Sequence, residues 1–333
     1  MDEQSASSYR ARTSTAISVC VLIAIAAPGF SIAATAGGLE LDSREYKLML
    51  KPDKFTGADP LKAVEQFTTE QLVPALREQW NYDAAGELTQ KGMQIGERRV
   101  IRFWDSGDCL LYRNGFAWRG RTEIDEHGKR ANELELTLKF RSPDAFLAAG
   151  MPVSAKDDAK KVDSKLEEDL GPVAVRGGPG EGVAANPRSV RSQFSRSTKQ
   201  TVSSDKVPGT LAGIAGLYPS FNDGLRMVAG NVQMSAPLEP SPEFRELVYE
   251  SSKLDITKDL KARLALTLWY EGAENADHPA LAEISFKYDV KNGAVPNEAA
   301  GRALKLLLVM QDLPWADPTA PTKTAFVACD KGT

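Results

Sequence analysis

The segment "ELELTLKFR", residues 133–141, places an apolar side chain at every even position and a polar or charged side chain at every odd position. A period of two predicts a β-strand with one apolar face and one face that carries both acids and bases. In an antiparallel sheet such a charged face usually points to solvent. The alternative is a closed barrel, in which the charged faces line the interior and helices cover the apolar outside.

The same alternation recurs along most of the chain. Further strands are expected over residues 43–51, 98–105, 109–123, 163–171, 189–202, 244–256, 262–271, 281–290 and 322–329. Segments rich in turn-forming residues separate many of them, and this spacing is typical of an antiparallel sheet or barrel.

Helices are expected in fewer places, over residues 59–80, 142–150, 210–218 and 296–313. Asp59 followed by Pro60 is a favourable start for the first helix, and Pro74 is expected to kink it. The fold class predicted from these patterns is α+β, mainly antiparallel β, with the sheet flanked by helices.

The N-terminal segment has the order of regions found in a secretory signal peptide. Arg10 and Arg12 precede an apolar run over residues 16–27, and small residues follow at Ala34 and Ala36. We therefore expect residues 1–36 to be removed and the protein to be periplasmic or secreted. The alternative is a single N-terminal anchor helix, for which the apolar run is short.

The remaining residues, 37–333, are expected to form one domain with a Gly/Pro-rich loop at 171–189. With 42% hydrophobic residues, the chain can bury a sizeable core. A net charge of −4 argues against nucleic acid or an acidic membrane as partners, although a local basic pocket remains compatible with it.

Two cysteines remain outside the signal-like segment. Export would place Cys109 and Cys329 where disulfides persist, and we expect them to pair. The alternative is two buried free thiols, because sequence does not show whether the two α-carbons approach each other.

Acids and bases share one face on several of the expected strands, including 43–51, 109–123 and 281–290. On an open sheet they would form cross-strand ion pairs that contribute little each. In a closed barrel they would line a lumen suited to a polyanion, with carboxylates for Mg²⁺ or Mn²⁺ and cations for phosphate oxygens.

Several ordered pieces of the chain resemble the CYTH family, also called triphosphate tunnel metalloenzymes. "SREYK" is similar to the opening E-x-E-x-K motif of that family, and the Arg-x-Arg hairpin followed by "ELELTLKFR" is the most specific part of the resemblance. The pieces that carry it are 43–47, 102–121, 133–141, 164–170, 192–202, 264–288 and 322–327.

The resemblance implies an eight-stranded antiparallel barrel around a charged tunnel. It also implies a small phosphate-rich partner, such as tripolyphosphate or a nucleoside triphosphate, and hydrolysis that depends on Mg²⁺ or Mn²⁺. By position, the expected metal ligands are Glu45, Glu135 and Glu283. The expected phosphate-binding cations are Lys47, Arg119, Arg121, Lys139, Arg196, Lys287 and Lys323.

Two departures from the family pattern leave the function open. Ser43 and Ser285 stand where the family has acids, and each change removes a possible metal ligand. The chain is therefore expected to be either a metal-dependent triphosphatase or a non-catalytic polyanion-binding protein that has lost metal ligands. A third hypothesis is a structural or interaction protein, in which the alternation of polar and apolar side chains reflects only the two faces of the sheet.

Overall fold

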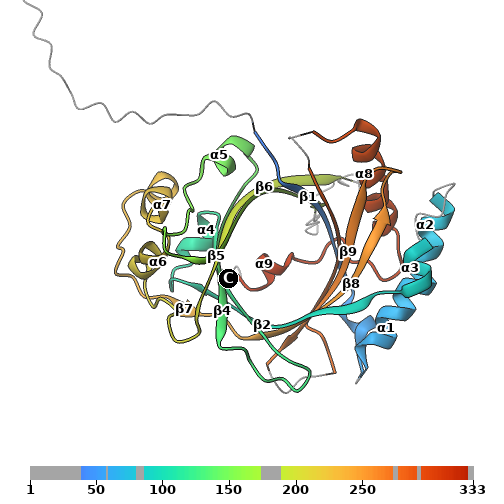
Figure 1. The fold of residues 1–333 in the computed structure, drawn as a ribbon, viewed down its shortest axis with the longest axis horizontal. Coiled ribbons are helices and arrows are strands. Elements are labelled where there is room, and N and C mark those ends of the chain that lie inside the picture. Colours follow the sequence, from blue (N-terminus) through green and yellow to red (C-terminus); the bar gives the residue numbers. More distant parts are fainter. Residues whose placement is uncertain are drawn as a thin grey trace, which may run out of the picture. The chain divides into compact units, whose positions relative to one another are not determined.

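In the described part of the chain, nine strands close into a barrel (Figure 1). The computed structural model describes residues 39–57, 59–79, 86–173, 189–272, 277–290 and 294–328. The barrel strands are β1 (Ser43–Leu50), β2 (Gln94–Asp105), β3 (Phe116–Glu123), β4 (Glu133–Ser142), β5 (Lys160–Pro172), β6 (Val190–Ser203), β8 (Phe244–Asp255), β9 (Lys261–Glu271) and β10 (Leu281–Asp289).

The strand order is β3-β4-β6-β5-β1-β10-β9-β8-β2, and pairing between β2 and β3 closes the ring. Neighbouring strands are antiparallel except β1 and β5, which are parallel. A two-residue strand, β7 (Glu239–Pro240), pairs with the end of β2.

The predicted α+β barrel is thus confirmed, but the expected count of eight strands is wrong. Each of the nine barrel strands overlaps a segment that was expected to be a strand, whereas the number eight came from the resemblance.

Helices cover two sides of the barrel. On one side lie α1 (Pro60–Gln66), a π-helical turn (Phe67–Leu72), α2 (Val73–Gln79), α3 (Gly86–Lys91) and α8 (Asn297–Gln311), with a 3₁₀ turn at Pro52–Phe55. On the other side lie α5 (Ala145–Gly150), α6 (Leu211–Leu217) and α7 (Phe221–Ala229). Among the described residues, no helix combines the length and apolar character that a membrane span requires.

The apolar faces of the strands pack against these helices. Tyr46 and Leu48 of β1 belong to a core that includes Val64 and Leu307 from the first helical group. Leu136 and Leu138 of β4 belong to a second core, formed with helices α6 and α7. Because successive side chains of a strand point to opposite faces, the charged side chains of the same strands face the barrel interior.

The first helical segment follows the sequence prediction closely. The Asp59 side chain accepts a hydrogen bond from the backbone N–H of Leu61 at 3.1 Å. The helix widens into the π-helical turn immediately before Pro74, which cannot donate a backbone hydrogen bond.

Two expected strand segments contain helix instead. The first residues of 109–123 form a helical turn, α4 (Leu110–Arg113), which the Asp105 carboxylate holds by accepting from the N–H groups of Leu111 and Tyr112. The predicted strand over 322–329 is wrong, because Lys323–Phe326 forms helix α9. The β2–β3 pairing has already closed the ring, so no free strand edge remains for this segment to join.

The predicted signal peptide (1–36) and most of the predicted loop 171–189 lie outside the described residues. Strands β5 and β6, which flank that loop, pair in register as far as Pro172 and Val190.

Candidate functional site

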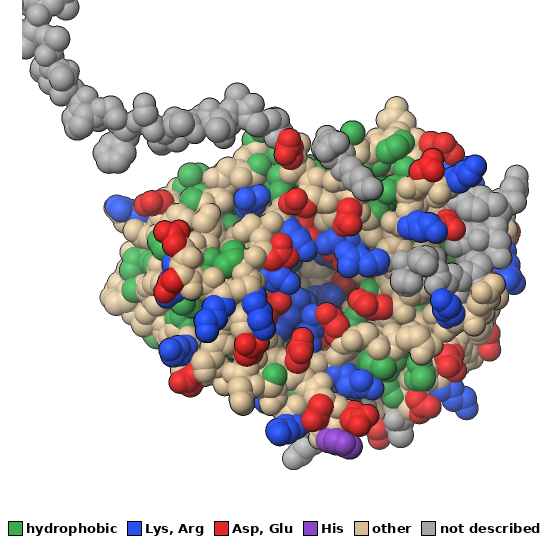
Figure 2. Space-filling model, viewed as in Figure 1, with side chains coloured by type: hydrophobic (Ala, Val, Ile, Leu, Met, Phe, Trp, Pro, Cys, Tyr) green, Lys and Arg blue, Asp and Glu red, His purple; other side chains and the backbone are tan. Residues whose placement is uncertain are grey.

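The charged faces of the strands converge inside the barrel. The strand register pairs Glu45 with Lys287 between β1 and β10, and Arg121 with Glu135 between β3 and β4. Viewed down the barrel, lysine, arginine, aspartate and glutamate side chains gather around a central hollow (Figure 2). The structure therefore favours the closed-barrel alternative over a solvent-facing charged sheet.

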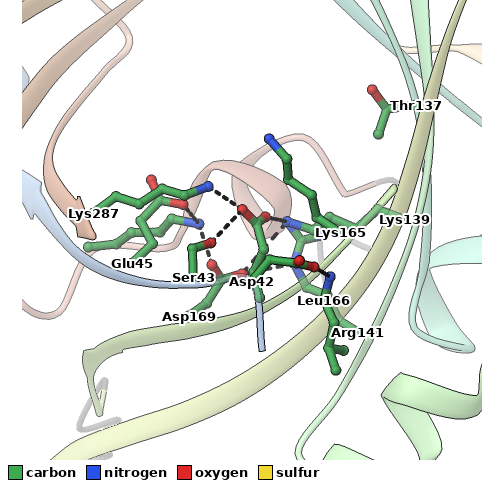
Figure 3. A network of polar contacts seen from close by, with 12 residues as sticks. Asp42, Ser43, Glu45, Thr137, Lys139, Arg141, Lys165, Leu166, Asp169 and Lys287 are labelled. Carbon is green, nitrogen blue, oxygen red and sulfur yellow. Dashed lines mark hydrogen bonds and ion pairs between the residues drawn. The ribbon is translucent and has the colours of Figure 1, made fainter. Parts of the chain in front are cut away.

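One group of charges, which we call the lysine cluster, joins β1, β4, β5 and β10 (Figure 3). Lys47 Nζ lies 3.0 Å from Glu45 Oε2 and 2.8 Å from Asp169 Oδ1. Lys139 Nζ lies 3.5 Å from Glu167 Oε2, and Lys287 is hydrogen-bonded to the same carboxylate. The cluster consists of Glu45, Lys47, Lys139, Glu167, Asp169 and Lys287.

Ser43 and Arg141 border the lysine cluster. The Ser43 hydroxyl donates a 3.0 Å hydrogen bond to Glu167, and Arg141 Nε lies 3.8 Å from Asp169 Oδ2. Ser43 thus orients a carboxylate of β5, although the position lacks the acid that the family motif has there.

Burial and close charges shift the pKa values within the lysine cluster. Burial raises the pKa of Glu167, but Lys139 and Lys287 outweigh it and bring the pKa down to about 2. The pKa of Lys139 is lowered to about 8. Burial is the largest cause, the nearby Arg141 and Lys47 add to it, and Asp169 and Glu167 raise this pKa by a smaller amount than the total decrease. For Lys47, Asp169 and Glu45 overcome the effect of burial and raise the pKa above its usual value. Glu167 is therefore ionised at neutral pH, and Lys139 loses its proton more easily than Lys47 does.

A second group, which we call the arginine cluster, surrounds the buried carboxylate of Glu246 on β8. Arg99 Nη2 lies 2.6 Å and Arg121 Nε 3.8 Å from Glu246 Oε2, and Trp269 Nε1 donates to Glu246 at 2.9 Å. Arg119 completes the cluster.

Arg119 lies beside Glu246 without a carboxylate partner within 4.0 Å among the described residues. Its Nη2 donates a 3.4 Å hydrogen bond to Thr137 Oγ1. The buried Nε atoms of Arg119 and Arg121 have no hydrogen-bond partner. Burial lowers the pKa of Arg119 well below its usual value, and the neighbouring Arg121 lowers it further. These guanidinium groups are donors that a bound anion would satisfy.

The C-terminal segment closes one end of the barrel. Helix α9 lies within the ring of strands in Figure 1, and Lys323 Nζ lies 2.7 Å from Oε1 of the buried Glu283. Phe326 packs against Phe244 with ring centroids 5.9 Å apart, within an apolar cluster that includes Trp269. A cavity of about 680 Å³ remains beside α9.

The expected site residues therefore fall into three places. Glu45, Lys47, Lys139 and Lys287 lie in the lysine cluster, and Arg119 and Arg121 lie in the arginine cluster with Glu135 3.9 Å from Arg121. Glu283 and Lys323 pair at the closed end. The prediction for Arg196 is wrong. The register sets Arg196 beside Phe140, whose side chain belongs to the outer core, so Arg196 does not face the tunnel.

The expected metal ligands do not form a metal site. Glu45, Glu135 and Glu283 lie on three different strands, and each is paired with a lysine: Lys47, Lys199 or Lys323. The part of the chain that the structure describes contains no group of three or more acidic, histidine or cysteine side chains arranged to hold a metal ion. The donor set therefore does not fit a resident Mg²⁺ or Mn²⁺.

Sequence reasoning missed four residues of the tunnel: Arg99, Glu167, Asp169 and Glu246. Alternation within "SKLEEDL" was the available signal for Glu167 and Asp169, because it places both on the face opposite to Leu166. For Glu246 the available signal was an acidic residue inside the predicted strand "FRELVYE".

The predicted disulfide stays a prediction. Cys109 is buried beside helix α4, and Cys329 lies outside the described residues.

Comparisons with solved structures found ten chains that are similar to this one, and two of them are described here. One is a candidate adenylate cyclase from Bacillus halodurans, with 12% identity, a TM-score of 0.35, and coverage of 85% of this chain and 95% of that chain. The other is a candidate adenylyl cyclase from Hippeastrum with a dominant triphosphatase activity, with 12% identity, a TM-score of 0.40, and coverage of 86% and 95%. No protein-family model and no curated protein matches the sequence. Because the sequence identities are 12% and the TM-scores lie below 0.5, these similarities show no function for this chain, and the tunnel side chains are the remaining guide to function.

Proposed function

We propose that this protein binds a small phosphate-rich anion, such as tripolyphosphate or a nucleoside triphosphate, in its barrel tunnel. The observation that carries the proposal is the pair of buried guanidinium groups, Arg119 and Arg121, whose Nε atoms have no hydrogen-bond partner. A buried donor without a partner is costly, and the cost is greatest for a charged group. An anion that reaches both guanidinium groups would remove that cost.

A phosphate-rich anion suits this arrangement better than a single carboxylate. Guanidinium groups bind phosphate oxygens through two parallel hydrogen bonds, and several of them fit a ligand with several phosphoryl groups. Arg99 pairs with Glu97 and Glu246, and Arg121 lies within 4.0 Å of Glu135 and Glu246. Arg119 has no carboxylate at that distance among the described residues, so its buried positive charge is the one most open to an anion.

Binding is favoured over metal-dependent hydrolysis. The carboxylates expected to hold a metal are paired with lysines, and Ser43 and Ser285 supply no negative charge. Both serines are buried and lie on the tunnel face, so these two departures from the family pattern fall inside the site itself. The signal-like N-terminus supports an extracytoplasmic role for the binding protein.

The test is a thermal-shift titration of the purified protein with tripolyphosphate, run together with an assay for released phosphate. A ligand that binds only the folded state raises the melting temperature. We expect a concentration-dependent rise in melting temperature and no phosphate release. Release that requires Mg²⁺ or Mn²⁺ would make the protein a hydrolase instead, and no thermal shift with any polyphosphate would contradict the proposal.

A further inference from the structure

We infer that lysine ammonium groups take the place of a divalent metal in this tunnel, so that its anion binds without Mg²⁺ or Mn²⁺. The part of the inference that concerns the anion rests on the proposed function. The part that concerns the metal does not, because metal binding can be tested on the anion-free protein. The inference concerns the lysine cluster, where three carboxylates from β1 and β5 lie close together.

Lys47 occupies the central position of this cluster. Its Nζ atom has a Glu45 oxygen at 3.0 Å on one side and an Asp169 oxygen at 2.8 Å on the other. Two carboxylates converging on one point are what a divalent cation would use. Here that point holds a positive charge that belongs to the chain.

Lys139 and Lys287 likewise supply positive charge to a neighbouring carboxylate, that of Glu167. Glu167 is hydrogen-bonded to Lys287, and Lys139 lies 3.5 Å away from its other oxygen. The hydroxyl of Ser43 adds a hydrogen bond at 3.0 Å. Both oxygens of Glu167 therefore have cationic or hydrogen-bonding partners inside the protein.

The low pKa of Glu167 agrees with this geometry, because the carboxylate is held ionised by fixed cations. A metal entering the cluster would have to displace an ammonium group and leave it in a mostly buried place, which is costly. We therefore expect the anion to bind to the metal-free form of the tunnel. In solution Mg²⁺ would instead associate with the free polyphosphate and compete with the protein's cations.

The first experiment titrates the anion-free protein with MgCl₂ or MnCl₂, against NaCl of matched ionic strength, and follows the melting temperature. For the wild-type protein we expect no shift beyond the NaCl control. Lys47→Met removes the ammonium group while keeping most of the side-chain volume. Its Glu45 and Asp169 carboxylates should then accept a metal, so Mg²⁺ should raise the melting temperature and EDTA should reverse the rise.

Lys54→Met is the matched control. Lys54 Nζ lies 3.6 Å from Asp53 Oδ2 at the surface, so its loss also frees a carboxylate from a lysine. Because that carboxylate stands alone in solvent, the control should gain no response to the metal. A wild-type protein that Mg²⁺ stabilises and EDTA destabilises would overturn the inference. A folded Lys47→Met variant with no metal response would overturn it as well.

The second experiment measures tripolyphosphate binding by calorimetry in EDTA and in excess Mg²⁺. We expect binding in EDTA to be at least as tight as in Mg²⁺. Affinity about tenfold tighter in Mg²⁺ would contradict the inference. If tripolyphosphate binds under neither condition, the proposed function fails, and the anion-free metal titration still decides the inference.

Discussion

Lys47 and Asp169 meet across the parallel pair of strands β1 and β5, with 2.8 Å between Nζ and Oδ1. Lys47 also reaches Glu45 of its own strand, so one ammonium group holds two carboxylates in the tunnel wall. The contact depends on the register between two strands that are far apart in the sequence. Together with the other ion pairs of the lysine cluster, this contact fixes the positions of the charges that an anion would encounter inside the barrel.

Stability should fall as the solution becomes acidic. Against the effect of burial, Lys139 and Lys287 lower the pKa of Glu167 to about 2 in the folded protein, below the ordinary glutamate value of 4.5. A depressed carboxyl pKa contributes stability that is present above the unfolded pKa and is lost as pH falls through the folded pKa. We expect the free energy of unfolding to decline between those two values in denaturant titrations.

Glu167→Gln is the variant that isolates this effect. It should lower stability at neutral pH and give a shallower decline in the acidic range. An unchanged acidic slope in the variant would show that Glu167 is not responsible for the decline.

Anion affinity should fall as pH rises through about 8. Burial lowers the pKa of Lys139 to about 8, so the ammonium group loses its charge above that pH. An anion binds the charged form better, and its dissociation constant should therefore increase with pH. Calorimetry from neutral to alkaline pH checks this, and Lys139→Met should weaken binding and flatten the pH profile. A profile identical to that of the wild type would remove Lys139 from the site.

Arg119→Met should make the protein more stable and a weaker binder. Removal of a buried guanidinium without a carboxylate partner relieves a desolvation cost in the anion-free protein. Its loss should weaken tripolyphosphate binding by about 10- to 100-fold, the range for a hydrogen bond to a charged group. Unfolding curves and calorimetry measure the two effects separately. A variant that loses stability and keeps its affinity would mean that Arg119 is structural.

Lys323→Met should destabilise the closed end of the tunnel. Glu283 is buried, and Lys323 is its ion-pair partner at 2.7 Å. Loss of one member of a buried pair typically costs about 3 kcal/mol or more, because the other charge stays uncompensated. The double variant Lys323→Met/Glu283→Gln should recover much of that loss in denaturant unfolding. No recovery in the double variant would show that packing of α9, and not the ion pair, sets the cost.

Much of the barrel could be predicted because alternation is a local signal. The segment 133–141 shows its two faces directly, and β4 buries the apolar face that this pattern predicts. The segment 322–329 was also expected to be a strand, yet Lys323–Phe326 forms a helix inside a ring that is already closed, and closure is not a local property.

The site was predicted less completely, for a related reason. Arg196 and Lys199 are both basic residues of β6, but only the register with β4 shows that Arg196 lies on the outer face, beside Phe140. The pairing of Glu45, Glu135 and Glu283 with lysines is likewise a matter of distance between strands. Sequence spacing gave the residue types of the tunnel, and the strand register decided their partners.

The central claim is that buried guanidinium groups in the tunnel bind a phosphate-rich anion. The most direct measurement is calorimetric titration of tripolyphosphate into the wild-type protein, the double variant Arg119→Met/Arg121→Met, and the control Arg196→Met on the outer face of the barrel. We expect the wild type and Arg196→Met to bind tripolyphosphate and the double variant to lose binding. Equal affinity in all three proteins, or an effect of Arg196→Met as large as that of the double variant, would contradict it.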